Sequence, residues 1–175
     1  MKIRYAAIFL ALPLLCTTAQ ANSFLHYAGE FNFRTGEKQN NVTIAGLSAI
    51  TFDAKKNIFY AINDSRNNNK EGDASLYTLK IQVSSRGIEQ VNFLNQRPLL
   101  DAKQQPFVTN TVDAEGLALT HNGKSLLWSS ELGAPLRLST LDGVMEKDFT
   151  SLFPARFNIS SDKESSNGIR SGNAW

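Results

Sequence analysis

A repeated unit of strand, turn, strand and acid constrains the fold of this 175-residue chain more than any other feature. In the first copy, runs 46–50 and 58–63 flank a polar turn, and Asp64 follows. In the second copy, runs 116–119 and 125–130 flank an Asn-Gly turn, and Glu131 follows. Asn-Gly between apolar runs is a strong hairpin signal. The copies lie about 70 residues apart, which suggests the repeated sheet units of a β-propeller, with insertions between them.

The rest of the chain also has a β pattern. Short runs rich in Ile, Phe, Tyr, Val and Leu alternate with polar clusters, and no long stretch keeps a helical apolar period. Strands are predicted at 25–33, 47–52, 57–63, 75–83, 88–94, 116–120, 125–130 and 136–140. We therefore expect an all-β, partial β-propeller-like array of antiparallel blades. There is material for two or three blades, whereas a closed ring needs about four. The expectation is thus an incomplete ring in a fragment of a longer protein.

The N-terminus has the three zones of a secretory signal peptide. Lys2 and Arg4 precede an apolar run at 6–16, and Ala-Gln-Ala at 19–21 fits a signal-peptidase site. The prediction is a cleaved signal at 1–21, a mature domain at 22–175, and a periplasmic or extracellular location. An uncleaved anchor is the alternative, but the run is shorter than the roughly 20 residues that span a bilayer. Lipidation of Cys16 is disfavoured because the large Leu15 precedes it.

Cleavage would change the charge and the cysteine content. Of 18 basic residues, Lys2 and Arg4 would be removed, leaving 16 basic and 16 acidic residues and no net charge. This balance argues against a nucleic-acid partner. Cys16 is the only cysteine, so the mature chain would have no disulfide and no thiolate site. It also has no second apolar run of spanning length, so no membrane partner is expected after cleavage. The pattern does not determine the oligomeric state.

Acidic residues stand at the ends of the two predicted hairpins. The strands of a hairpin run antiparallel, so Glu115 and Glu131 should lie at the same end, with Asp113 two residues upstream. Asp64, with Arg66 close behind it, ends the first hairpin. If the hairpins stack as blades, these residues share a face. Clustered carboxylates repel unless a cation or a shared proton holds them, and an exported protein favours Ca²⁺. The alternative is that they are solvated turn residues.

Several segments also resemble a known family, the phytase-like domain described as esterase-like activity of phytase. They are 46–50 (GLSAI), 59–66 (FYAINDSR), 98–102 (PLLDA) with 105–107 (QPF), 112–119 (VDAEGLAL), 129–131 (SSE), 153–157 (FPARF) and 168–170 (GIR). Their order fits the family and they span most of the mature chain. The resemblance implies an exported, propeller-like protein that hydrolyses phosphomonoesters or phosphodiesters.

Site roles follow from this resemblance and from the clustered acids. The expected roles are catalytic for Glu115 and Glu131, phosphate-binding for Arg66 and Arg170, and metal-binding, with Ca²⁺, for Asp64, Asp113 and Glu115. A small phosphoester is the expected substrate.

Two departures from the family pattern stand out. Ser65 occupies a position where a second acid often follows, and the chain ends at Trp175, where an aromatic-Glu-Gly unit would begin. Any hydrolase activity is therefore expected of a full-length parent. Two alternatives remain: a non-catalytic exported propeller that binds a ligand or a protein through its acidic face, and a lactonase-like metal propeller.

Overall fold

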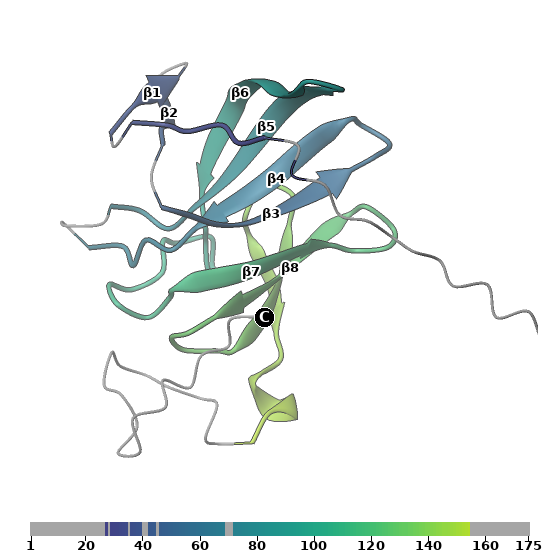
Figure 1. Ribbon diagram of the computed structural model, residues 1–175. Helices are drawn as coiled ribbons and strands as arrows, with labels where there is room; N and C mark the ends of the chain where they lie inside the picture. The colour runs from purple at the N-terminus through teal and green to yellow at the C-terminus, as the bar shows by residue number, and fades with distance from the viewer. Residues whose placement is uncertain are drawn as a thin grey trace, which may run out of the picture.

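The fold is known from a computed structural model, which describes residues 27, 29–34, 36–39, 42–44, 46–68 and 72–154 (Figure 1). The predicted signal peptide at 1–21 and the segment 155–175 lie outside the described residues, so the predictions made for them stay predictions. The described part holds two four-stranded antiparallel sheets and a two-stranded ribbon. None of its helices is long and apolar enough to cross a membrane.

Each four-stranded sheet is a meander in which consecutive strands pair, in the orders β3-β4-β5-β6 and β7-β8-β9-β10. The elements are β1 (Lys38–Gln39), β2 (Val42–Thr43), β3 (Leu47–Asp53), β4 (Ile58–Asn63), β5 (Ser75–Ser84), β6 (Gly87–Pro98), β7 (Ala114–Leu119), β8 (Ser125–Ser130), β9 (Leu136–Thr140), β10 (Met145–Asp148) and the 3₁₀ turn η1 (Thr150–Leu152). The all-β, antiparallel prediction is confirmed. Arrangement of these sheets as propeller blades stays a prediction.

The alternation of side chains along β4 divides its apolar residues between two clusters. Tyr60 and Ile62 point toward the second sheet and pack with Leu126 and Trp128 of β8. Ala61, between them in β4, points the other way and packs with residues of β5 and β6 in a second cluster on the far face of the first sheet. Period-two alternation with both faces covered explains why β4 is apolar almost throughout. The core between the sheets therefore fixes their relative placement.

Strands β3 and β7 lie side by side where the two sheets meet (Figure 1). Two side chains of β3 cross this seam. The Ser48 hydroxyl donates to the Ala114 carbonyl oxygen at 2.6 Å and also lies 3.2 Å from the Ile62 carbonyl oxygen. The Thr51 hydroxyl accepts the Leu119 N–H at 3.2 Å. Polar contacts of defined geometry thus set the position of β3 along β7.

Strand pairing makes the two hairpins equivalent at a constant offset of 67 residues, close to the predicted spacing. Ala49 pairs with Ile62 as Gly116 pairs with Ser129. The backbone bond from the Asp64 N–H to the Gly46 carbonyl, 3.0 Å, recurs between Glu131 and Asp113 at 2.8 Å. The sequence comparison had aligned Gly46 with Gly116 as equivalent residues of the two copies. The strand pairing shifts this alignment by three residues. Gly46 is instead the counterpart of Asp113.

One strand prediction is wrong over its described residues, and the short strands β1, β2 and β10 were not predicted. Residues 29–33, part of the strand predicted at 25–33, form no strand. The Phe33 ring instead packs on the first sheet, 5.3 Å from the Phe93 ring, and the Phe31 ring packs against Phe33. Strand β10 was not predicted because its sequence, Met-Glu-Lys-Asp, is charged. It lies at the edge of the second sheet with β9 as its strand neighbour among the described residues, and charged residues are typical of edge strands.

Removal of the Ser48 hydroxyl tests the seam. We expect Ser48→Ala to lower the free energy of unfolding by about 1–2 kcal/mol, because the Ala114 carbonyl oxygen loses its 2.6 Å donor. The measurement is urea unfolding followed by tryptophan fluorescence. Ser85→Ala, in the exposed β5–β6 turn, is the matched control and should change stability by less than about 0.5 kcal/mol. Equal effects of the two substitutions would contradict a stabilising role for the seam.

Candidate functional site

Three carboxylates converge where β7 begins and β8 ends. Asp113, Glu115 and Glu131 each place one carboxylate oxygen within 4.8 Å of the others, and we call this group the acid cluster. Asp113 is 2% exposed, and the other two are partly buried. The antiparallel geometry of the hairpin produces this meeting, as expected from the sequence.

A β-bulge places Glu115 in the cluster. The pairing of β7 with β8 passes from Ala114 opposite Ser130 to Gly116 opposite Ser129, which leaves Glu115 as an extra residue. Bulges of this kind bend a strand and re-aim a side chain, and they are common beside active sites. The same irregularity occurs in β3 at Ser48, the residue equivalent to Glu115.

The loop after β4 brings Arg66 to the acid cluster. Its Nη2 donates to Asp113 Oδ2 at 2.6 Å, and its side chain is 23% exposed. Asn67, the next residue, fixes this loop: it adopts a left-handed conformation, its amide donates to the Phe107 carbonyl, and its Oδ1 accepts the Ala74 N–H. The Arg66 carbonyl in turn accepts the Asn110 N–H at 2.8 Å. The first sheet thereby supplies the positively charged Arg66 side chain that faces the carboxylates of the second sheet.

Asp64 lies near the acid cluster but is not one of its three members. It is exposed, and its carboxylate lies so close to Gly46 that a side-chain methyl there would collide with it. Its charge still reaches the cluster, since it contributes to raising the pKa of both Asp113 and Glu115. Asp64 thus extends the negative field. Arg170 lies outside the described residues, so its predicted phosphate contact stays a prediction.

Electrostatic strain is concentrated on Glu115. Burial, followed by the charges of Asp113, Glu131 and Asp64, raises its pKa to about 7 although Arg66 acts in the opposite direction. The pKa of Asp113 is also raised, first by burial, although the ion pair with Arg66 opposes this. One arginine therefore does not neutralise the group. Close carboxylates of this kind release their repulsion by taking up a proton or a cation.

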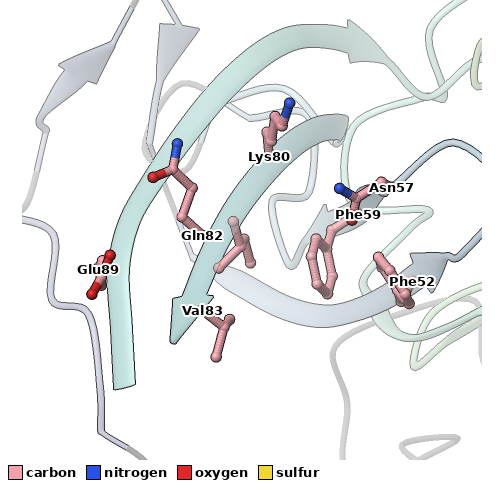
Figure 2. A pocket seen from close by; sticks show the side chains of 8 residues that line it. Phe52, Asn57, Phe59, Lys80, Gln82, Val83 and Glu89 are labelled. Atoms are coloured by element: carbon pink, nitrogen blue, oxygen red, sulfur yellow. The ribbon is translucent and has the colours of Figure 1, made fainter. Parts of the chain in front are cut away.

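A depression lies at the end of the first sheet away from the acid cluster (Figure 2). It has a volume of about 460 Å³, and the rings of Phe52 and Phe59 lie 4.6 Å apart in its wall. Asn57, also in the wall, precedes β4, whereas Asp64 follows it, so roughly 20 Å of strand separates this hollow from the acids. Glu89 is its only acidic lining residue. The acid cluster is therefore the better candidate for chemistry.

Sequence reasoning missed three contributors to the site. Asn67 and Ser48 act through backbone contacts that no local pattern indicates. Arg137 lies fully inside β9 between Leu136 and Leu138, and a charged residue at a position that faces the core was the available signal.

Comparison with known proteins gives one match. Residues 42–174 match the profile of a family described as Phytase-like: Esterase-like activity of phytase. No curated protein and no solved structure matches significantly. The matched range contains the acid cluster, Asp64 and Arg66.

Stability against pH tests the strain on Glu115. Its pKa is about 7 in the folded chain against an ordinary 4.5. As pH rises, the Glu115 carboxyl therefore loses its proton at a lower pH in the unfolded chain than in the folded chain. The free energy of unfolding should fall between pH 4.5 and 7 by on the order of 1–2 kcal/mol, a figure reduced because solvent reaches the carboxyl. With chelator present, Glu115→Gln should remove this loss and be more stable than the wild type at pH 8, with little difference at pH 4.5.

Glu89→Gln is the matched control. Glu89 is exposed, and hydrogen bonds from Ser84 and Arg86 lower its pKa, which is the opposite direction. This variant should show no stabilisation at pH 8 in urea unfolding. A Glu115→Gln variant that is less stable than the wild type at pH 8 would contradict the assigned strain.

Proposed function

The chain belongs to the phytase-like family, described as esterase-like activity of phytase, and from this premise we propose that it is a calcium-dependent phosphoesterase whose active site is the acid cluster. The observation that carries the proposal is the convergence of three carboxylate oxygens within 4.8 Å beside an arginine. Hydrolysis of a phosphate ester is the activity that this combination of anionic ligands and a guanidinium supports best.

The donor set of the acid cluster fits a hard cation. Carboxylate oxygens are the ligands that Ca²⁺ prefers, and Asp113, Glu115 and Glu131 supply three of them from one hairpin. Burial and, after it, their mutual repulsion raise the pKa values of Asp113 and Glu115, and a bound cation would relieve this repulsion. Bound there, calcium would offer positive charge to a phosphate and would polarise a water molecule. The predicted export of the chain would place it where calcium is available.

The residues of the chain contribute orientation and charge. Arg66 is held by its ion pair with Asp113, and its exposed part faces solvent beside the cluster, a placement suited to binding a phosphate oxygen. Glu115 and Glu131 are the carboxylates that we expect to take part in catalysis. Asp64 adds negative charge near them, and we expect it to strengthen cation binding rather than to bind phosphate.

Calcium titration and phosphate release test this function. The full chain should bind Ca²⁺ in isothermal calorimetry, and Glu131→Gln should weaken that affinity about tenfold or more, because one anionic ligand is lost. It should also release phosphate from a chromogenic phosphomonoester or phosphodiester, and a chelator should abolish this activity. Glu89→Gln, at the far end of the first sheet, should leave both quantities unchanged.

Each alternative outcome has a distinct meaning. Activity that persists in chelator would contradict the metal-dependent mechanism. Calcium binding without turnover of phosphoesters would favour the non-catalytic binding function, and hydrolysis of a lactone instead would favour the lactonase-like one.

A further inference from the structure

Arg137 is a buried charge that the acid cluster does not contain. Arg137 is 4% exposed. The centre of its guanidinium lies 4.8 Å from the Trp128 ring centroid and 5.2 Å from the Phe107 ring centroid. Burial lowers the pKa of Arg137 to about 10, so it stays charged at neutral pH. Moving a guanidinium out of water costs several kcal/mol unless its surroundings compensate. Such a costly placement suggests a specific role.

Arg137 contacts both of the backbone segments that carry the acids. Its Nη2 lies 3.4 Å from the Thr111 carbonyl oxygen and 3.4 Å from the Leu132 carbonyl oxygen. Thr111 stands two residues before Asp113, and Leu132 directly follows Glu131. One nitrogen therefore bridges the chain entering β7 and the chain leaving β8.

Gly133 permits this close approach. Its φ is +67°, and a Cβ there would lie 2.6 Å from the Thr111 carbonyl oxygen and 2.7 Å from Arg137 Nη2. A side chain would separate the three groups, so the compact arrangement requires glycine.

On the basis of the proposed metal-dependent function, we propose that Arg137 is a positioning residue, which holds the segments carrying Asp113 and Glu131 at the separation that cation binding needs. The guanidinium acts through two backbone carbonyls. The charges that perturb Asp113 are those of Arg66, Glu131 and Asp64, and Arg137 is not among them. Groups that orient ligands from behind commonly change metal affinity 10–100-fold when they are removed.

Amide hydrogen exchange in the metal-free full chain tests the positioning. Arg137→Met keeps an apolar stem beside the two rings but loses both carbonyl contacts. The amides of Asp113 and Glu131 should then exchange about tenfold faster relative to that of Ala61 in β4, because local opening becomes easier. Arg137→Lys retains the positive charge but lacks the forked guanidinium, so it should give a smaller change in the same direction. This variant replaces Arg137→Met if the latter does not fold.

Trp128→Phe is the matched control for general loosening. It loses the 2.8 Å bond from the indole N–H to the Ser139 hydroxyl and part of the ring stacking, but keeps the two carbonyl contacts of Arg137. It should lower stability without selective exchange at Asp113 and Glu131. Exchange that is unchanged in the Arg137 variants, or raised evenly over both sheets, would overturn the proposal.

Calcium affinity gives a second and separable readout. Arg137→Met or Arg137→Lys should bind Ca²⁺ about tenfold more weakly in calorimetry, whereas Trp128→Phe should stay near the wild type. Wild-type protein that binds no Ca²⁺ would overturn the proposed function, while the exchange experiment would still decide whether Arg137 positions the two segments. Wild-type binding with undiminished affinity in the Arg137 variants would overturn the positioning proposal alone.

Discussion

The ion pair between Arg66 and Asp113 is the interaction on which the site depends. Asp113 is 2% exposed, and an isolated carboxylate at that depth would be costly, so a partner 2.6 Å away is required. Arg66 comes from the loop of the first sheet and Asp113 from the start of the second. The pair therefore forms only if the sheets meet along the β3–β7 seam. Its single positive charge leaves the acid cluster negative, and that remaining charge is what suits the site to a cation.

The two hairpins use equivalent positions for different purposes. At the constant offset of 67 residues, Ser48 corresponds to Glu115, and both stand at a bulge. The Ser48 side chain forms a hydrogen bond across the seam, whereas the Glu115 side chain is part of the acid cluster. Asp64 corresponds to Glu131, but its hairpin has Gly46 where the second has Asp113. A cluster of three acids therefore arises on one hairpin only, and the other contributes the arginine and the surface against which it packs.

Sequence patterns predicted most of the central strands because alternation and turn residues are local signals. The Asn-Gly turn at 122–123 is confirmed, with Gly123 at a φ of +68°. The edge strand β10 escaped prediction because solvent exposure permits charged residues there. Alternating aromatics at 29–33 were mistaken for a strand, since stacking on an existing sheet needs the same spacing of apolar residues as strand pairing. Errors thus fall at the borders of the sheets, where composition carries less information.

By itself the sequence determined the all-β class, the hairpins, the resemblance to the phytase-like family and the acids at the hairpin ends. Only the tertiary structure decided which of those acids meet. It brought Glu115 to Asp113 and Glu131 through a bulge, left Asp64 beside them, paired the expected Arg66 with Asp113, and buried Arg137 against the backbone that leads to Asp113. The physical reason is range: strand periodicity acts between neighbouring residues, whereas the position of a carboxylate to within an ångström depends on how two sheets pack and where a ladder is interrupted.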